Sequence, residues 1–180
     1  MGNRFTAYAA STGPGDLYLS NGSTDVFFDV LTLAGCHVAE TPWQQNLVLL
    51  FADGHRHSQG FAGFDLGEIP WTVDWPAEKE FLLRVIDTAL GRHGWHRLRY
   101  DPPAAAGHLA RYREMVVAFT PAPVDAPRWG DWRMAPAPAL LIRCPEHDLY
   151  EGEAGCRLCD PSIQPVEQRR SGDGTSIPPG

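Results

Sequence analysis

The sequence lacks several features that would assign it to a common class of protein. No run approaches the roughly 18 apolar residues that a membrane-spanning helix needs. The N-terminal segment also has no apolar region of the kind found in secretory signals. The G-x-G-x-x-G, P-loop, G-x-S-x-G and H-E-x-x-H motifs are absent. We therefore expect a cytoplasmic protein with no membrane partner and none of the common nucleotide-binding or hydrolytic sites.

Basic residues are scarce relative to acidic ones. The 15 Lys and Arg residues against 22 Asp and Glu residues give a formal net charge of −7. Proteins that bind nucleic acid neutralise phosphates with Lys and Arg, so this balance makes nucleic acid the less favoured partner and a basic protein the more favoured one. The nucleic-acid alternative requires the arginines to gather on one face, namely Arg97, Arg99, Arg111, Arg113, Arg128, Arg133 and Arg143.

Cysteine is also scarce, but three of the four cysteines lie close together near the C-terminus. Cys144 and His147 form one pair with a two-residue gap, and Cys156 and Cys159 form a second. Such a gap lets both side chains of a pair reach one metal ion, and four nitrogen or sulfur ligands suit tetrahedral Zn²⁺. The alternative, a disulfide framework, is typical of secreted chains. The spacing therefore predicts one structural zinc ion with no open position for catalysis.

The two pairs also resemble a known class of metal-binding module. The segments "CPEH" and "CRLC" resemble the two knuckles of zinc-ribbon and zinc-knuckle modules, and the resemblance covers residues 144–159 only. It implies a short segment that zinc ligation holds together in place of a hydrophobic core. Two arginines against five acidic residues lie in 143–160, and this acidity favours a structural role or a protein contact over phosphate binding.

Hydrophobic periodicity and capping signals predict the rest of the fold. Thr41 is expected to cap a helix that begins at Pro42, and the apolar spacing of Phe27, Leu31, Ala34 and Val38 predicts another. The predicted helices cover residues 25–38, 42–51, 74–94 and 102–119. Short strands are expected at 5–10, 16–20, 95–100 and 140–144, and a short strand or extended segment at 61–66.

These elements predict a helix-rich α+β single domain with few short strands and a small C-terminal zinc-bound module. The expected division is a domain over 1–120, a Pro-rich arm or linker over 121–139 with its tryptophans laid on the domain, a zinc-binding module over 140–160 and a disordered tail over 161–180. The Ala, Arg and Pro richness is typical of bacterial proteins from high-GC genomes.

Three further sets of residues are candidates for function. Asp53, His55 and His57 offer a loop that could bind a catalytic metal ion. Cys36 is a candidate nucleophile, although an apolar helix usually holds an inert thiol. Exposed tryptophans would mark a protein-binding surface, and the candidates are Trp71, Trp75, Trp129 and Trp132.

The favoured hypothesis is therefore a non-catalytic, zinc-stabilised intracellular protein that binds a protein partner. One form of it is an acidic inhibitor of the immunity or antitoxin type, which would attract a basic partner through complementary charge. The alternatives are a zinc-containing nucleic-acid-binding or regulatory protein and a metalloenzyme that uses the loop of Asp53, His55 and His57.

Overall fold

The computed structural model describes residues 2–8, 15–56, 63–102, 104–125 and 127–160, and all statements below concern these residues. They form a helix-rich α+β fold with the cysteine cluster near the C-terminal end, which confirms the predicted fold class. The helices are α1 (Asn21–Val38), α2 (Pro42–Asp53), α3 (Trp75–Leu90) and α4 (Ala105–Ala118), and the strands are β1 (Gly2–Phe5) and β2 (Leu17–Ser20).

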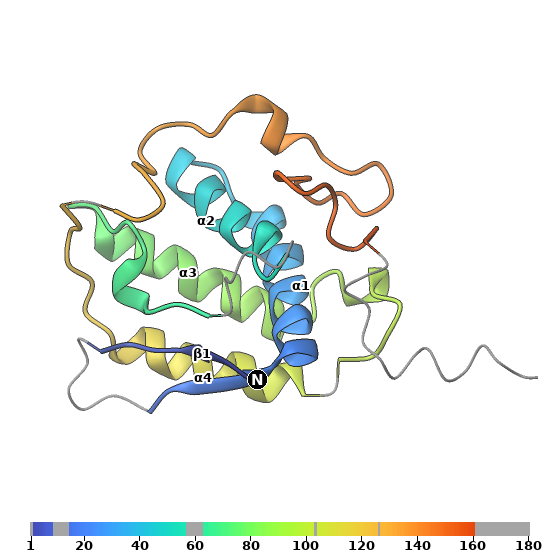
Figure 1. Ribbon diagram of the computed structural model, residues 1–180, viewed down its shortest axis with the longest axis horizontal. Helices are drawn as coiled ribbons and strands as arrows, with labels where there is room; N and C mark the ends of the chain where they lie inside the picture. The colour runs from blue at the N-terminus through green and yellow to red at the C-terminus, as the bar shows by residue number, and fades with distance from the viewer. Residues whose placement is uncertain (1, 9–14, 57–62, 103, 126, 161–180) are drawn as a thin grey trace, which may run out of the picture.

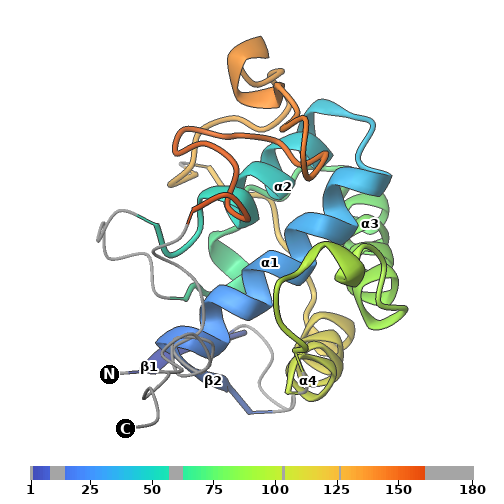
Figure 2. The ribbon, with the colours of Figure 1, turned by 90° about the vertical axis from the view of Figure 1, so that its right-hand side faces the viewer.

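Helix α1 lies at the centre of the molecule and packs against each of the other three helices and the strands (Figure 2). It begins four residues before the predicted start, because Ser20 rather than Ser23 or Thr24 is the N-cap and accepts a hydrogen bond from the backbone of Ser23. Nearly every residue from Phe27 to Cys36 is buried, as expected for a helix covered on several sides.

Helix α2 begins where the capping signal predicted. The Thr41 hydroxyl accepts a hydrogen bond from the backbone N–H of Gln44, and the side-chain oxygen of Gln44 accepts one from the backbone N–H of Thr41. Pro42 occupies the first turn. The helix crosses α1 at Gly35, where an added Cβ would lie 2.6 Å from a methyl group of Val48. Glycine therefore permits the close approach of α1 and α2.

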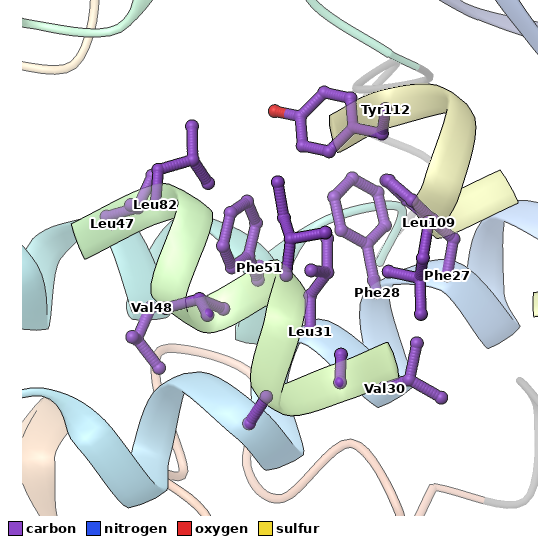
Figure 3. Packing of buried hydrophobic residues seen from close by; sticks show 14 of the residues in the cluster. Phe27, Phe28, Val30, Leu31, Leu47, Val48, Phe51, Leu82, Leu109 and Tyr112 are labelled. Atoms are coloured by element: carbon purple, nitrogen blue, oxygen red, sulfur yellow. The ribbon is translucent and has the colours of Figure 1, made fainter. Parts of the chain in front are cut away.

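Aromatic and aliphatic side chains from all four helices fill one core (Figure 3). The ring centroids of Phe27 in α1 and Tyr112 in α4 are 5.2 Å apart. Those of Phe28 in α1 and Phe51 in α2 are 6.2 Å apart. The residues predicted to face inward from the fourth helix are all buried, namely Leu109, Tyr112, Val116 and Phe119.

The strands form an antiparallel hairpin that covers one end of α1. β1 pairs with β2 from Gly2 opposite Ser20 to Phe5 opposite Leu17, so the first strand starts and ends earlier than predicted. Of the predicted segment at 61–66, Asp65 forms a parallel bridge with Thr6, whereas Leu66 already belongs to a 3₁₀ turn. Residues 9–10 and 61–62 of these predictions lie outside the described residues.

Two predicted strands were wrong. Residues 95–100 contain the 3₁₀ turn η2 (Trp95–Arg97), because Gly94 adopts a left-handed conformation (φ 72°) and turns the chain. Residues 140–144 contain the end of the 3₁₀ turn η3 (Pro138–Leu141) and a single bridge from Arg143 to Tyr150. A further 3₁₀ turn, η1 (Leu66–Glu68), precedes α3.

The Pro-rich segment, described over residues 121–125 and 127–139, runs from the end of α4 along the outside of the helices to the cysteine cluster (Figure 1). Its tryptophans rest on the body, as predicted. Trp132 is buried with its ring 5.6 Å from that of Trp43, and Asn46 of α2 donates to the carbonyl of Met134. The expected tail over 161–180 lies outside the described residues.

Candidate metal centre

Four side chains of residues 140–160, which we call the cysteine segment, converge on one point. One ligand atom from each of Cys144, His147, Cys156 and Cys159 lies within 4.8 Å of the others. Nδ1 of His147 is 3.3 Å from the sulfur of Cys159, 3.6 Å from that of Cys156 and 3.7 Å from that of Cys144. Three of the four side chains are buried, and Cys159 is the exposed one.

These separations fit a tetrahedral site. Zinc–sulfur bonds of about 2.3 Å and zinc–nitrogen bonds of about 2.0–2.1 Å place tetrahedral sulfurs roughly 3.8 Å apart and sulfur and nitrogen roughly 3.6 Å apart. The sulfurs of Cys144 and Cys159 are 3.7 Å apart. The donor set and its spacing therefore fit a single tetrahedral metal ion, with Nδ1 as the imidazole ligand.

Tight turns hold the four ligands in place. The backbone of Cys144 donates to the carbonyl of Leu149, and Asp148, in a left-handed conformation (φ 55°), donates back to Cys144 at 2.8 Å. The second turn is closed by a 3.1 Å hydrogen bond from the backbone of Cys159 to the carbonyl of Cys156. Each pair thus sits on its own tight turn, as the two-residue gaps predicted.

Arg157, between the two cysteines of the second turn, extends into the helical body. Its side chain is 1% exposed and pairs with the buried carboxylate of Asp29 in α1 at 2.5 Å. Its guanidinium also donates to three backbone carbonyls at the end of α2, those of Phe51, Ala52 and Gly54. Carbonyls at a helix C-terminus have no partner within the helix, so Arg157 caps α2 from the cysteine segment.

Asp53 and Arg56, at the end of α2, hold the turn before the second pair. The carboxylate of Asp53 accepts hydrogen bonds from the backbones of Glu153 and Ala154 at 3.0–3.3 Å. Arg56 donates to the carbonyls of Gly155 and Ala154. Gly152 (φ 61°) lies so close to Asp53 that an added Cβ would come within 2.4 Å of its carboxylate. The body is therefore shaped to receive this turn.

The turn that carries Cys144 and His147 is held at the C-terminal end of α1. Arg143 donates to the carbonyl of Cys36 at 2.7 Å, and the backbone of Tyr150 donates to the sulfur of Cys36 at 3.3 Å. Arg97 donates to the carbonyl of the ligand His147 at 2.7 Å. Burial raises the pKa of Cys36 to about 12, so this thiol stays protonated at neutral pH.

Asp53 and His55, candidates for a catalytic metal site, have other partners. Asp53 binds the backbone of the cysteine segment, and burial raises the pKa of its carboxyl. His55 has a left-handed backbone (φ 60°), and its Nδ1 lies 2.6 Å from the carboxylate of Asp25. His57 lies outside the described residues. In the described part of the chain, the Cys144–Cys159 group is the only cluster of this kind.

The four tryptophans that were candidates for partner binding pack against the core. Trp71 and Trp132 are 2% and 4% exposed, and Trp71 donates through its indole nitrogen to the carbonyl of Leu66. Trp75 and Trp129 are partly buried. Without a rearrangement, only Trp75 and Trp129 offer any surface to a partner.

The arginines named for the nucleic-acid alternative are spread over several elements, and most pair with carboxylates. Arg111 and Arg113 lie on α4 and pair with Glu114 and Asp87. The remaining pairs are Arg99 with Glu146, Arg128 with Glu68, Arg133 with Asp131 and Arg143 with Asp148. Only Arg97, Arg99 and Arg143 lie beside the cysteine segment.

Sequence reasoning missed the residues that attach the cysteine segment to the body. Arg157 was treated as one of several charges, and Asp29 was not singled out. The one local signal was an aspartate within an otherwise apolar helix, since a buried carboxylate requires a partner.

No family model, curated protein or solved structure matches the chain. Among the described residues, none of the helices combines the length and apolar character needed to cross a membrane.

Proposed function

We propose that Cys144, His147, Cys156 and Cys159 bind one structural Zn²⁺ ion, and that the protein is a non-catalytic intracellular binding protein acting on a protein partner. The observation that carries the metal assignment is the convergence of these four ligand atoms within 4.8 Å of one another, with Nδ1 of His147 3.3–3.7 Å from each sulfur. Three thiolates and one imidazole favour zinc over hard cations such as Mg²⁺, which prefer oxygen. Four protein ligands leave no position for water or substrate.

The structural role of this zinc ion follows from what the segment lacks. Apart from the ligands Cys144 and Cys156, residues 140–160 bury only Leu149 and Tyr150 in the hydrophobic core, so the turns around the ligands depend on ligation for their shape. The ion would hold Arg157 in position between two of its ligands, and Arg157 in turn connects the segment to α1 and α2.

The zinc assignment is tested by elemental mass spectrometry of the purified protein. We expect one zinc per chain, and its loss in the double variant Cys156→Ser with Cys159→Ser. Cys36→Ser is the matched control, because Cys36 is a buried thiol outside the ligand set, and this variant should keep its zinc. A wild-type protein without zinc, or a double variant that retains it, would overturn the assignment.

The proposal of a protein partner rests on charge. The chain carries −7, and the zinc site itself, with three thiolates and Zn²⁺, would add a further negative charge to an acidic segment. Glu153 and Glu146 of this segment are exposed. An acidic surface of this kind speeds association with a basic partner, as an inhibitor of the immunity or antitoxin type requires.

This part of the proposal is tested by charge reversal on a partner that co-purifies from the native source. We expect Glu151→Lys with Glu153→Lys to slow association and to reduce its salt dependence. The control, Glu80→Lys with Glu114→Lys, makes the same charge change on the exposed surfaces of α3 and α4 and should leave association close to wild type. Equal effects of both pairs would show that only net charge matters and would remove this segment as the contact surface.

A further inference from the structure

A second group of chemically active side chains lies outside the candidate metal centre. A cleft of about 420 Å³ opens where the end of α1 meets the loop after α3 and the first turn of the cysteine segment. Its polar lining comes from His37, His93, Arg97, Arg143 and Asp148. This volume falls within the range of roughly 300–1,000 Å³ that small-molecule sites occupy.

Two imidazoles form one wall of the cleft. The rings of His37 and His93 are stacked, with centroids 3.9 Å apart and planes inclined by 19°. A metal ion binds an imidazole nitrogen in the plane of the ring, so two nearly parallel rings do not converge on a common ion. The stacked pair is therefore better suited to donating hydrogen bonds than to chelating a metal.

The charge of the cleft is positive, although the chain as a whole is acidic. Two guanidinium groups against the single carboxylate of Asp148 leave a net formal charge of +1 with both imidazoles neutral. Cys36 adds no negative charge, because burial raises the pKa of its thiol to about 12. Arg143 also covers the carbonyl of Cys36 at the negative end of α1.

Arg97 provides the main donor group. One of its terminal nitrogens binds the carbonyl of His147 at 2.7 Å and fixes the side chain, which leaves the rest of the planar guanidinium available to the cleft. Burial, together with His37, Arg97 and His96, lowers the pKa of His93, as expected where positive groups crowd together. An anion in the cleft would relieve this repulsion.

We propose that this cleft binds a phosphate-class oxyanion, either the free ion or the phosphoryl group of a small metabolite, with Arg97 and the two imidazoles as its principal donors. Arg143 adds positive charge and also binds Asp148 of the lining through an ion pair. The site borders the zinc ligands but includes none of them, so the protein would carry a small-molecule site in addition to its proposed partner-binding surface.

The proposal is tested by titrating the zinc-loaded full chain with inorganic phosphate, with glycerol 2-phosphate as a small phosphomonoester in parallel. We expect saturable shifts of the imidazole resonances of His37 and His93 in NMR spectra, and an upward shift in the apparent pKa of His93. Tighter binding of the monoester would identify a metabolite phosphoryl group as the ligand, and equal binding would identify the free ion.

Two variants and a salt control make the test decisive. His93→Gln should weaken phosphate binding about tenfold, since a hydrogen bond to a charged group is lost. His108→Gln is the matched control, because His108 lies on α4 and does not line the cleft, and the affinity of this variant should stay close to wild type. Zinc content confirms that each variant is folded. Equal shifts with chloride at the same ionic strength, absence of saturation, or equal losses in both variants would overturn the proposal.

Discussion

At the scale of single residues, Arg157 is the main side chain that connects the cysteine segment to the helices, because it binds both α1 and α2. It is 1% exposed, and its charge is balanced by Asp29, whose second carboxylate oxygen accepts a hydrogen bond from Tyr100 at 2.6 Å. A buried ion pair of this kind is strongly destabilising when one partner alone is removed, because the other charge is left without compensation.

We therefore expect Arg157→Leu to lower the free energy of unfolding by about 3–5 kcal/mol. The loss includes the capping bonds to the carbonyls of α2 and removes the ion-pair partner of the buried Asp29 carboxylate. Urea denaturation followed by circular dichroism measures the change. Arg113→Leu is the matched control, since Arg113 pairs with Asp87 on the exposed surface and its removal should not move the midpoint detectably. Similar midpoints for both variants would show that Arg157 does not connect the segment to the body.

At the scale of elements, the start of α3 contains a buried carboxylate. Glu78 is 8% exposed and accepts hydrogen bonds from the backbone and hydroxyl of Thr72. Burial raises the pKa of its carboxyl above the ordinary value of 4.5, more than these hydrogen bonds lower it. The folded state therefore holds this proton more tightly than the unfolded chain does.

The sign of the pH dependence follows from linkage. Where the folded state binds more protons, the free energy of unfolding falls as the pH rises, so the contribution of Glu78 is present below 4.5 and is lost as the pH passes the raised pKa. Glu78→Gln removes this titration. We expect the stability of Glu78→Gln relative to wild type to rise as the pH increases from about 4. Urea denaturation at several pH values measures this difference in unfolding free energy. A difference that is independent of pH would contradict this reasoning.

The elements also show what a sequence can predict. The starts of α2 and α3 were predicted to within one residue because their signals are local. These are Thr41 with Pro42 for α2, and Pro76 in the first turn of α3. Residues 95–100 were predicted as a strand, and this failed because Gly94 sets a turn that only the packed chain reveals. The metal ligands were predicted for the same reason as the helix starts, since two-residue gaps are local.

The contacts that position the candidate metal centre could not be predicted in that way. Arg157 and Asp29 are 128 residues apart in the chain, and the sequence contains no local pattern that pairs them. Asp53 looked like a candidate for catalysis because its partner, the backbone turn at residues 152–154, is equally remote. The predicted division into a domain, an arm and a separate zinc module stays a prediction.

At the scale of the whole molecule, the question is whether the cysteine segment and the helices unfold as one unit. Three of the contacts that join them lie at different places: Arg157 to α1 and α2, Asp53 to the turn before the second pair, and Arg143 to the end of α1. If zinc holds the segment in shape, its removal should disturb all three contacts and lower the stability of the helices as well.

We expect a chelator to lower the thermal midpoint of helix unfolding by about 10 °C in a single transition, since a loss of about 3–5 kcal/mol in a chain of this size corresponds to a shift of that order. Differential scanning calorimetry together with circular dichroism of the helices measures it. The variant Cys156→Ser with Cys159→Ser is the control, because it lacks two ligands and the chelator should leave its midpoint unchanged. A wild-type midpoint that does not respond to zinc removal would mean that the helices hold their fold without the segment, and that the segment is attached to the body without stabilising it.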